Sequence, residues 1–591
     1  MRQKKPHPRY KLRVFFGFLL LAGIVGGLTF GVMYHNVINP DAMLRTQTEI
    51  EEPVIPEAEP PEPYEPAPPP PPLQPPPPVR RPAQAQQPQP EEPPPPPTPW
   101  ELFNPSPLPE TDPAYFPNFA FLNQINENMT LYPIHFGMPD EFTNVIGVTT
   151  FRGNNFRNDP TWGHVNVTQE RLSVRYQIAV GSLGTWTGIG WSGQPVIIQW
   201  DYEIQQIMNI HPNMRNQNGL VEVIQGAMDG FIYFFELRTG EETRPRINLG
   251  EPIKGGVTVD ARGYPLLYVG QGDLVRGGRF GYFIFSLIDG SELFFLNGGD
   301  YFAWRWWQAF DANPLIDVVN DRVIIAGENG IIYSILLNTE FDIEAGTISI
   351  DPIISRYRHT GSRMVGTENS PAAFGHYLFF ADNAGWIQCI DLRTLEPVWV
   401  FDAGDDTDAT LVLEWEEENE RLVIFTGAQV DWRRQAADSY IRKLDAATGE
   451  VLWVTTFLCG FDANANGGVT ATPIVGRHDI SNLVIFSVAR TLGRGADGLI
   501  VALCKETGEE VWTFGMVGFG WSSPVAVYSQ NGTSYIIVSD STGRMYMLRG
   551  TTGEEVYRLN LGANVEASPA VFYNMLVVGT RGNRIFGIEI L

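Results

Sequence analysis

The chain has 591 residues, enough for several domains or for one long array of repeats, and its formal net charge is −26. Acidic residues outnumber basic ones by 67 to 41, which argues against nucleic-acid binding because that function needs a concentrated basic surface. Three cysteines, Cys389, Cys459 and Cys504, are too few and too odd in number for a disulfide framework.

The amino-terminal segment has the pattern of a membrane anchor. Residues 1–13 are basic, and residues 14–34 (VFFGFLLLAGIVGGLTFGVMY) contain no charged side chain over a length that spans a bilayer. A cleaved signal peptide would have a shorter apolar core and a small-residue cleavage site, so we interpret this segment as an uncleaved transmembrane helix, with cleavage as the alternative. The positive-inside rule then predicts a single-pass protein of the cell membrane, with a basic cytoplasmic tail and an extracytoplasmic remainder.

Residues 35–112 are predicted to be a Pro-rich, disordered extracytoplasmic linker. Runs such as PPEPYEPAPPPPPLQPPPP cannot form a packed core and prefer polyproline II, which makes a semi-rigid spacer. A docking motif for a partner domain is the alternative. Residues 113–171, which include TTFRGNNFRNDPTWG, are expected to be a lead-in that packs over the outside or over one face of the remaining chain.

From residue 172 to residue 591 the chain repeats one unit. The phrases KLDAATGEVLW (443–453), ALCKETGEEVW (502–512) and MLRGTTGEEVY (547–557) each place a Thr-Gly turn between two apolar strands. Glycine tolerates the positive φ of such a turn, and the flanking strands make this a β-hairpin signal. The turns recur at roughly 45 to 60 residues, close to the periods that indicate propellers.

Each repeat contains four short strands, which is the content of one propeller blade. The count reaches eight, but the last repeat ends without its fourth strand. The stretch LSVRYQIAVG, residues 172–181, resembles that missing strand and is predicted to pair with the carboxyl-terminal strands. The fold class predicted is therefore all-β: an eight-bladed β-propeller of four-stranded antiparallel blades, closed by an N-terminal strand and preceded by one transmembrane helix and the linker.

The Thr-Gly and Trp phrases resemble the pyrrolo-quinoline quinone (PQQ)-like repeat β-propeller family. This family includes quinoprotein dehydrogenases and the propeller of an outer-membrane assembly lipoprotein. In the family the aromatic residue after the turn packs against the next blade. The resemblance therefore implies a structural docking role for Trp399, Trp453, Trp512 and Tyr557.

The resemblance leaves two functions open. Dehydrogenases of the family hold PQQ and calcium near the axis and typically carry an adjacent cysteine pair, which this sequence does not have. We therefore predict no cofactor and no catalytic residue, and expect a non-catalytic scaffold or ligand-binding module at the cell surface, with a protein or cell-wall ligand as partner. The alternative is a quinone- and calcium-dependent dehydrogenase.

Residues just before the first strand of each blade are expected to face the axial funnel. Mixed aromatic, acidic and amide side chains there suit a sugar, a peptide or a cation, and a solvated rim without a ligand is the alternative. The candidates for ligand binding in this funnel are Trp191, Asp311, Asn313, Glu368, Asn369, Trp521 and Glu566.

Two further motifs each allow two interpretations. In FDANANGG, residues 461–468, the side chains of Asp462, Asn464 and Asn466 alternate as at the start of a calcium loop, although Pro473 stands where such a loop needs Glu. A metal site and a self-satisfied turn both remain open for this segment. The aromatic run WRWW, residues 304–307, is either an exposed platform or a wedge between blades, and we expect the wedge.

Overall fold

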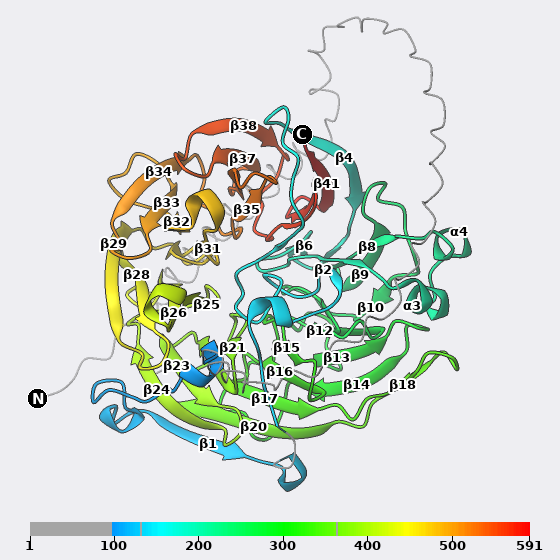
Figure 1. Cartoon of the computed structure of the whole chain (residues 1–591), viewed down its shortest axis with the longest axis horizontal. Helices are drawn as coiled ribbons and strands as arrows, with labels where there is room; N and C mark the ends of the chain where they lie inside the picture. Colours follow the sequence, from blue (N-terminus) through cyan, green and yellow to red (C-terminus); the bar gives the residue numbers. More distant parts are fainter. Residues whose placement is uncertain (1–96, 130–132, 362–364) are drawn as a thin grey trace, which may run out of the picture. The chain divides into compact units, whose positions relative to one another are not determined.

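Eight blades surround a central axis in the computed structural model, which describes residues 97–129, 133–361 and 365–591 (Figure 1). The predicted all-β, eight-bladed propeller is confirmed. Within these ranges no helix is long and apolar enough to cross a membrane. The predicted tail 1–13, the predicted span 14–34 and most of the predicted linker lie outside them.

The first four blades occupy residues 196–402, and each runs from an inner to an outer strand. Blade 1 has β7 (Val196–Gln199), β8 (Val221–Gly226), β9 (Phe231–Glu236) and β10 (Ile247–Asn248); blade 2 has β11 (Thr258–Val259), β12 (Leu266–Gly270), β13 (Gly281–Ser286) and β14 (Glu292–Asn297). Blade 3 has β15 (Leu315–Asp317), β16 (Arg322–Ala326), β17 (Ile331–Leu336) and β20 (Ile353–Thr360); blade 4 has β21 (Ala372–Phe374), β22 (Tyr377–Ala381), β23 (Trp386–Asp391) and β24 (Glu396–Asp402).

The last four blades follow the same order, except that blade 8 takes its outer strand from the start of the array. Blade 5 has β25 (Val412–Glu416), β26 (Arg421–Gly427), β28 (Ala437–Asp445) and β29 (Val451–Cys459); blade 6 has β31 (Ile474–Val475), β32 (Leu483–Ala489), β33 (Gly498–Cys504) and β34 (Glu510–Met516). Blade 7 has β35 (Val525–Tyr528), β36 (Ser534–Ser539), β37 (Arg544–Arg549) and β38 (Glu555–Asn560); blade 8 has β39 (Ala570–Phe572), β40 (Met575–Thr580), β41 (Arg584–Ile590) and β4 (Leu172–Ala179).

Short helices and short strands connect or extend the blades. Between β7 and β8 stand the helices α3 (Tyr202–Ile207) and α4 (Pro212–Arg215). Two short hairpins pair β5 (Ser182–Leu183) with β6 (Trp186–Thr187) and β18 (Glu340–Asp342) with β19 (Thr347–Ser349). Strands β27 (Gln429–Val430) and β30 (Gly467–Gly468) also pair, and β30 joins them to β32 in the sheet of blade 6.

Strand β4 closes the ring. It pairs antiparallel with β41, with Val174 opposite Ile588 and Ala179 opposite Arg584. The predicted closure is therefore confirmed, and it satisfies backbone groups of β41 that an open array would leave at an edge.

The second and third strands of each blade carry the core. All seven residues of β32 are buried, because each sheet packs a neighbouring blade on both of its faces. This explains why these strands have continuous apolar sequences, whereas the outer strand β29 alternates between exposed and buried residues.

The Thr-Gly turn is where one blade contacts the blade before it. Gly449 has φ 75°, and a Cβ at this position would lie 2.7 Å from the ring of Trp399. The indole Nε1 of Trp399 donates to the carbonyl of Ala446 at 2.9 Å. Glycine is needed here both for its positive φ and because the indole lies directly over it.

The same contact recurs around the ring. Trp453 lies over Gly508 and Trp512 over Gly553, and each indole donates to a carbonyl three residues before the glycine. Tyr557 is half-buried against the core of blades 7, 8 and 1. Across the closure, Tyr176 of β4 lies over Gly240 of blade 1.

The docked part of the chain begins before the predicted end of the linker. Helix α2 (Pro99–Leu102) and Phe103 pack on blade 4, where Phe103 is buried against Phe374 and Phe379. The prediction that the linker extends to residue 112 is therefore wrong. Trp100, Leu102 and Phe103 interrupt the Pro-rich composition with apolar side chains that bury surface on the propeller.

The lead-in, residues 113–171, covers both the outside and one face. Strand β1 (Ala120–Gln124) adds an outer strand to blade 3 by pairing with β20. Strand β2 (Ile146–Val148) pairs with β7 of blade 1, and β3 (Thr161–Trp162) runs parallel to β39 of blade 8. In Figure 1 this segment crosses the centre of the ring.

Candidate functional site

One end of the axial channel is closed by lead-in residues 149–160, a segment that we call the plug. Two arginines of the plug are fully buried. Arg152 donates from Nη1 to the carbonyl of Pro524 at 2.8 Å and from Nη2 to the carbonyl of Pro473 at 3.0 Å. Arg157 donates from Nε to Pro371 at 2.8 Å and from Nη2 to Pro314 at 3.2 Å.

These four carbonyls belong to blades 7, 6, 4 and 3. The two guanidinium groups therefore bind the inner strands of four of the eight blades. Burial lowers the pKa of Arg152 and of Arg157 to about 9, because water no longer solvates the charged form. The plug backbone adds further bonds, since the carbonyls of Thr149, Asn155 and Phe156 accept from inner-strand amides of blades 2, 4 and 5. We call this end of the ring the plugged face.

The other end, the open face, leads into a cavity of about 370 Å³. Each blade contributes to its wall at least one residue from the loop that precedes its inner strand. One such residue from each blade, in blade order, gives the series Trp191, Lys254, Asp311, Glu368, Asp408, Thr470, Trp521 and Glu566. Backbone geometry common to all blades therefore brings acidic, basic, hydroxyl and aromatic side chains to one place.

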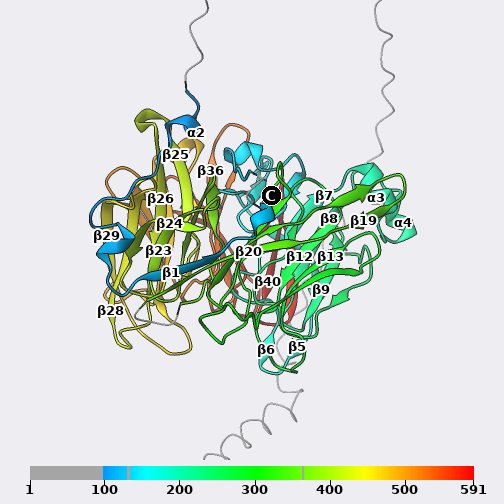
Figure 2. The same ribbon diagram turned by 90° about the horizontal axis from the view of Figure 1, so that it is seen from below.

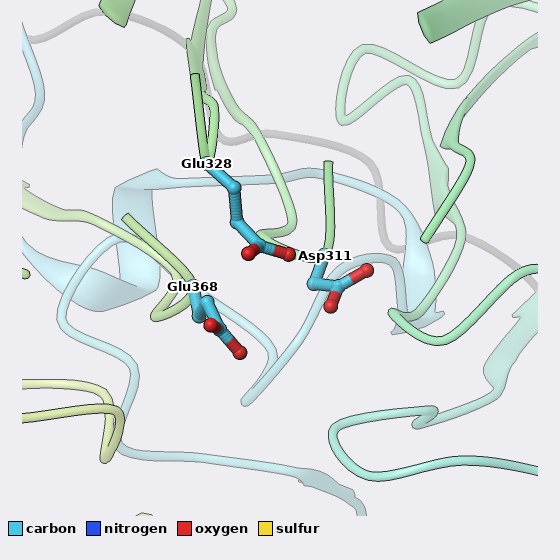
Figure 3. A group of neighbouring side chains, drawn as sticks. All are labelled: Asp311, Glu328 and Glu368. Carbon is cyan, nitrogen blue, oxygen red and sulfur yellow. The ribbon is translucent and has the colours of Figure 1, made fainter. Parts of the chain in front are cut away.

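An acidic group occupies one side of the cavity (Figure 3). Carboxylate oxygens of Asp311, Glu328 and Glu368 all lie within 4.8 Å of one another. Lys254 is their counter-ion, with Nζ 2.6 Å from Asp311 Oδ2 and 3.6 Å from Glu328 Oε1. Arg305 lies farther away, 4.0 Å from Glu328.

This arrangement makes Asp311 and Glu328 harder to ionise than exposed carboxyl groups. Burial, and then repulsion from neighbouring carboxylates, raises the pKa of Asp311 and of Glu328, while Lys254 opposes the shift. Burial lowers the pKa of Lys254, but Asp311, Glu328 and Glu368 outweigh it, so the pKa of Lys254 lies well above its usual value. Among the described residues, Asp311 Oδ1 has no hydrogen-bond donor.

A second acidic pair continues the wall in blade 5. Burial raises the pKa of Asp406 and of Asp408 well above the ordinary range, and the charge of Glu368 adds to both shifts. Gln429 donates to Asp408 Oδ2, but Asp408 Oδ1 has no donor among the described residues. In blade 8, burial raises the pKa of Glu566, although Arg581 lies 3.1 Å away and opposes this.

Three tryptophans complete the wall. Lys254 and Arg581 each lie 5.8 Å from the centre of the Trp186 ring, within the range of a cation–π contact. No described lysine or arginine lies over the rings of Trp191 or Trp521 in this way. The cavity thus combines aromatic faces with an excess of carboxylates.

The structure places five of the seven predicted funnel residues on the cavity: Trp191, Asp311, Glu368, Trp521 and Glu566. Asn313 and Asn369 do not line it, which corrects the expectation for these two. Both are buried, and their amides donate to backbone carbonyls, Asn313 to Val257 and Asn369 to Ala381 and Thr407. Ligand binding by the five remains a prediction.

The predicted metal trio is divided. Asn464 and Asn466 line the cavity, whereas Asp462 does not. Asp462 Oδ1 accepts from the backbone amide of Asn464 at 2.9 Å, and its Oδ2 lies 3.5 Å from Arg490. This geometry corresponds to the self-satisfied turn that was the alternative interpretation.

The expected wedge at residues 304–307 is wrong for two of its tryptophans. Trp304 and Trp306 are 51% and 72% exposed, because the contacts between blades are already made by the aromatic residues of the outer strands. Arg305 and Trp307 are half-buried, and Arg305 Nη1 donates to Asn383 Oδ1 at 2.9 Å.

Sequence reasoning missed several residues of the site. Lys254 and Asp408 stand directly before their inner strands, as Asp311 does, so the same positional rule could have found them. Glu328, Gln429 and Arg581 lie between the second and third strands, and no sequence pattern marked them.

The residues present do not fit the quinone cofactor. PQQ is a tricarboxylate and needs cationic partners, whereas the cavity wall offers four carboxylates against Lys254 and Arg581. A divalent cation would find oxygen ligands in Asp311, Glu328 and Glu368, but the Lys254 ammonium already pairs with Asp311 and Glu328.

Comparison with known proteins finds a family that the carboxyl-terminal part resembles. Residues 496–591 match the sequence model of a family described as outer membrane protein assembly factor BamB. No curated protein matches the chain.

Among solved structures, BamB from Moraxella catarrhalis is 18% identical to this chain. The match covers 70% of this chain and 98% of that one, with a TM-score of 0.40. A computationally designed protein, Ika8, is 14% identical, covering 73% of this chain and 100% of that one, also with a TM-score of 0.40. The resemblance to PQQ-like repeat propellers is thereby confirmed, and the family match itself covers residues 496–591.

Proposed function

We propose that the protein is a non-catalytic interaction scaffold, tethered to the cell membrane by residues 14–34, whose propeller binds a partner protein through its open face. The family matched by residues 496–591 is described as an assembly factor, which supports a role in protein assembly. A cavity wall that does not suit PQQ argues against the dehydrogenase alternative.

The observation that carries the proposal is the aromatic character of the open face. The loop between β14 and β15 brings Asp311 to the cavity and also carries Tyr301, Trp304 and Trp306, with Tyr301 76% exposed. Exposed apolar side chains also occur at Leu274, in the β12–β13 loop of blade 2, and at Val517, in the loop between blades 6 and 7. Clustered exposed aromatic residues mark protein interaction sites, where tryptophan and tyrosine contribute most of the binding energy.

Helix α2, at the start of the described residues, does not lie on the open face. Helix α2 lies at one end of the propeller and the β5–β6 hairpin at the opposite end (Figure 2). Trp100 of α2 contacts Gly375, in the turn between the first and second strands of blade 4, on the plugged face. A partner can therefore approach the open face without displacing helix α2.

Site-specific photocrosslinking in cells tests the proposal. A photoreactive amino acid replacing Trp306 in the full-length chain should give one discrete adduct with a partner protein. The matched control replaces Tyr573, which is 51% exposed in a turn of the plugged face. Equal labelling from both positions, or no adduct from position 306, would contradict the proposal.

A further inference from the structure

We infer that the axial cavity receives the ammonium or guanidinium group of a basic side chain, presented by the partner that covers the open face. The inference rests on the proposed function and adds the chemistry of the group that the partner inserts. Three features carry it: the charge of the cavity, its unpartnered oxygens and its free aromatic faces.

Charge is the first step. The wall carries Asp311, Glu368, Asp408 and Glu566 against Lys254 and Arg581, and Glu328 lies buried behind it. Inside a cavity of low dielectric, such an excess of carboxylates disfavours anions strongly and favours an entering cation.

Unpartnered oxygens are the second step. Asp311 is fully buried, lines the cavity, and has no donor for Oδ1 among the described residues. Asp408 Oδ1 is likewise without a donor in the part of the chain that the structure describes. A buried acceptor without a donor is costly, and an ammonium group supplies three donors and a guanidinium group five.

Aromatic faces are the third step. Lys254 and Arg581 both approach Trp186, so the cavity already holds cations against an indole ring. The rings of Trp191 and Trp521 are two further walls without such a cation among the described residues. A neutral sugar would also stack on these rings, but it would leave the acidic excess uncompensated.

The surroundings favour a protein side chain over a free small cation. The loop between β14 and β15 supplies Asp311 to the cavity wall and carries Tyr301, Trp304 and Trp306, and these aromatic side chains would contact apolar residues flanking an inserted lysine or arginine. A free quaternary ammonium compound has the same charge chemistry but makes no use of this loop.

Calorimetric titration of the full-length chain in detergent measures the binding. The probes are Nα-acetyl-lysine methylamide, its neutral analogue Nα-acetyl-norleucine methylamide, choline, and a peptide with one lysine between tryptophan and leucine. We expect saturable binding of the lysine derivative, none of the norleucine derivative, and at least tenfold tighter binding of the peptide. Choline binding tighter than the peptide would overturn the assignment to a protein side chain.

Variants locate the binding. The double substitution Glu368→Gln and Asp408→Asn should weaken lysine binding at least tenfold, whereas Glu506→Gln, an exposed acid away from the cavity, should not change it. Asn464→Lys places a competing ammonium group at the cavity wall without altering a buried acid, and should weaken binding to a similar degree. Unchanged binding in both cavity variants, or no saturable binding of any cationic probe, would refute the inference.

The two proposals fail separately. If photocrosslinking from position 306 succeeds while no cation binds, the scaffold function stands and the cation site is wrong. If cationic probes bind the cavity but no adduct forms at position 306, the cavity is a receptor for a free cation and the scaffold proposal is wrong.

Discussion

Lys254 is the residue on which the acidic side of the cavity depends. Its Nζ lies 2.6 Å from Asp311 and 3.6 Å from Glu328, and both carboxylates are almost fully buried. Removing one partner of a buried ion pair leaves uncompensated charge, which costs more than the pair contributes when intact.

We predict that Lys254→Met destabilises the fold by about 3 kcal/mol near pH 8 and by less near pH 5. Without Lys254, the pKa of Asp311 and Glu328 rises further, because Glu368 still repels them and Arg305 is the remaining nearby cation. The folded chain then binds more protons than the unfolded chain, so stability falls as pH rises above the unfolded pKa of about 4. Chemical denaturation at the two pH values measures this.

The control for that measurement is Arg433→Met, which removes an exposed positive charge. It should change the free energy of unfolding by less than about 0.5 kcal/mol at both pH values. A loss in Lys254→Met that is equal at pH 5 and pH 8 would contradict the titration argument.

Tryptophans of this chain fall into two classes by position. Trp453 is 9% exposed over Gly508, and Trp306 is 72% exposed on the open face. We predict that Trp453→Ala costs about 3–5 kcal/mol of stability, whereas Trp306→Ala costs less than about 0.5 kcal/mol. Thermal unfolding of both variants tests this, and similar losses in the two would show that the docking contact is not structural.

At the scale of the element, the loop before each inner strand shows how far the sequence could predict the site. Asp311, Glu368, Trp521 and Glu566 each stand three residues before a proline, and a repeat-by-repeat alignment predicts that such positions converge. Asn313 lies two residues after Asp311, and Asn369 lies one residue after Glu368. The side chains of both asparagines point away from the cavity and donate to backbone carbonyls. The repeat period in the sequence assigns each loop residue to a blade. It does not identify which of two or three consecutive residues points to the axis, because a shift of one residue changes the direction of the side chain.

The plug could not be predicted at all in this way. Its residues do not repeat, and its contacts join positions more than 350 residues apart, such as Arg152 and Pro524. Turn signals and strand periods describe local structure, so they give no information about a single segment that crosses the ring. The fold was predicted from local patterns that recur, whereas the plug depends on contacts that occur once.

We predict that Arg157→Met costs about 3 kcal/mol of stability, because Arg157 makes five hydrogen bonds inside the ring and four of them go to backbone carbonyls. The Pro314 carbonyl would keep Thr150 Oγ1 as a donor, whereas the other three would lose the Arg157 donor. Arg549→Met, which removes a half-exposed arginine paired with Glu170, should cost much less, because solvent screens this ion pair. Denaturant titration compares the two. Equal losses would mean that the plug does not stabilise the propeller.

At the scale of the whole molecule, the ring is held by a contact between its two ends. Strand β4 is separated from β41 by about 400 residues of sequence, yet it completes blade 8 and places Tyr176 over Gly240 of blade 1. In an open array, each blade would have only its sequence neighbours, and the edges of blades 1 and 8 would be exposed to other chains.

This makes the start of the chain decisive for the stability of its end. A chain that begins at residue 97 keeps α2, the plug and β4, and we predict a single cooperative unfolding transition for it. A chain that begins at residue 182 has every strand of blades 1 to 7 but no β4 and no plug, so blade 8 loses its outer edge and the prolines of the inner strands lose Arg152 and Arg157. We expect this shorter chain to unfold at a markedly lower temperature and to aggregate through its exposed edge.

Supplying residues 97–181 as a separate peptide should restore the unfolding temperature of the shorter chain toward that of the longer chain, since the lost contacts are non-covalent. If the shorter chain unfolded at the same temperature as the longer one, closure by β4 would not be what holds the ring together.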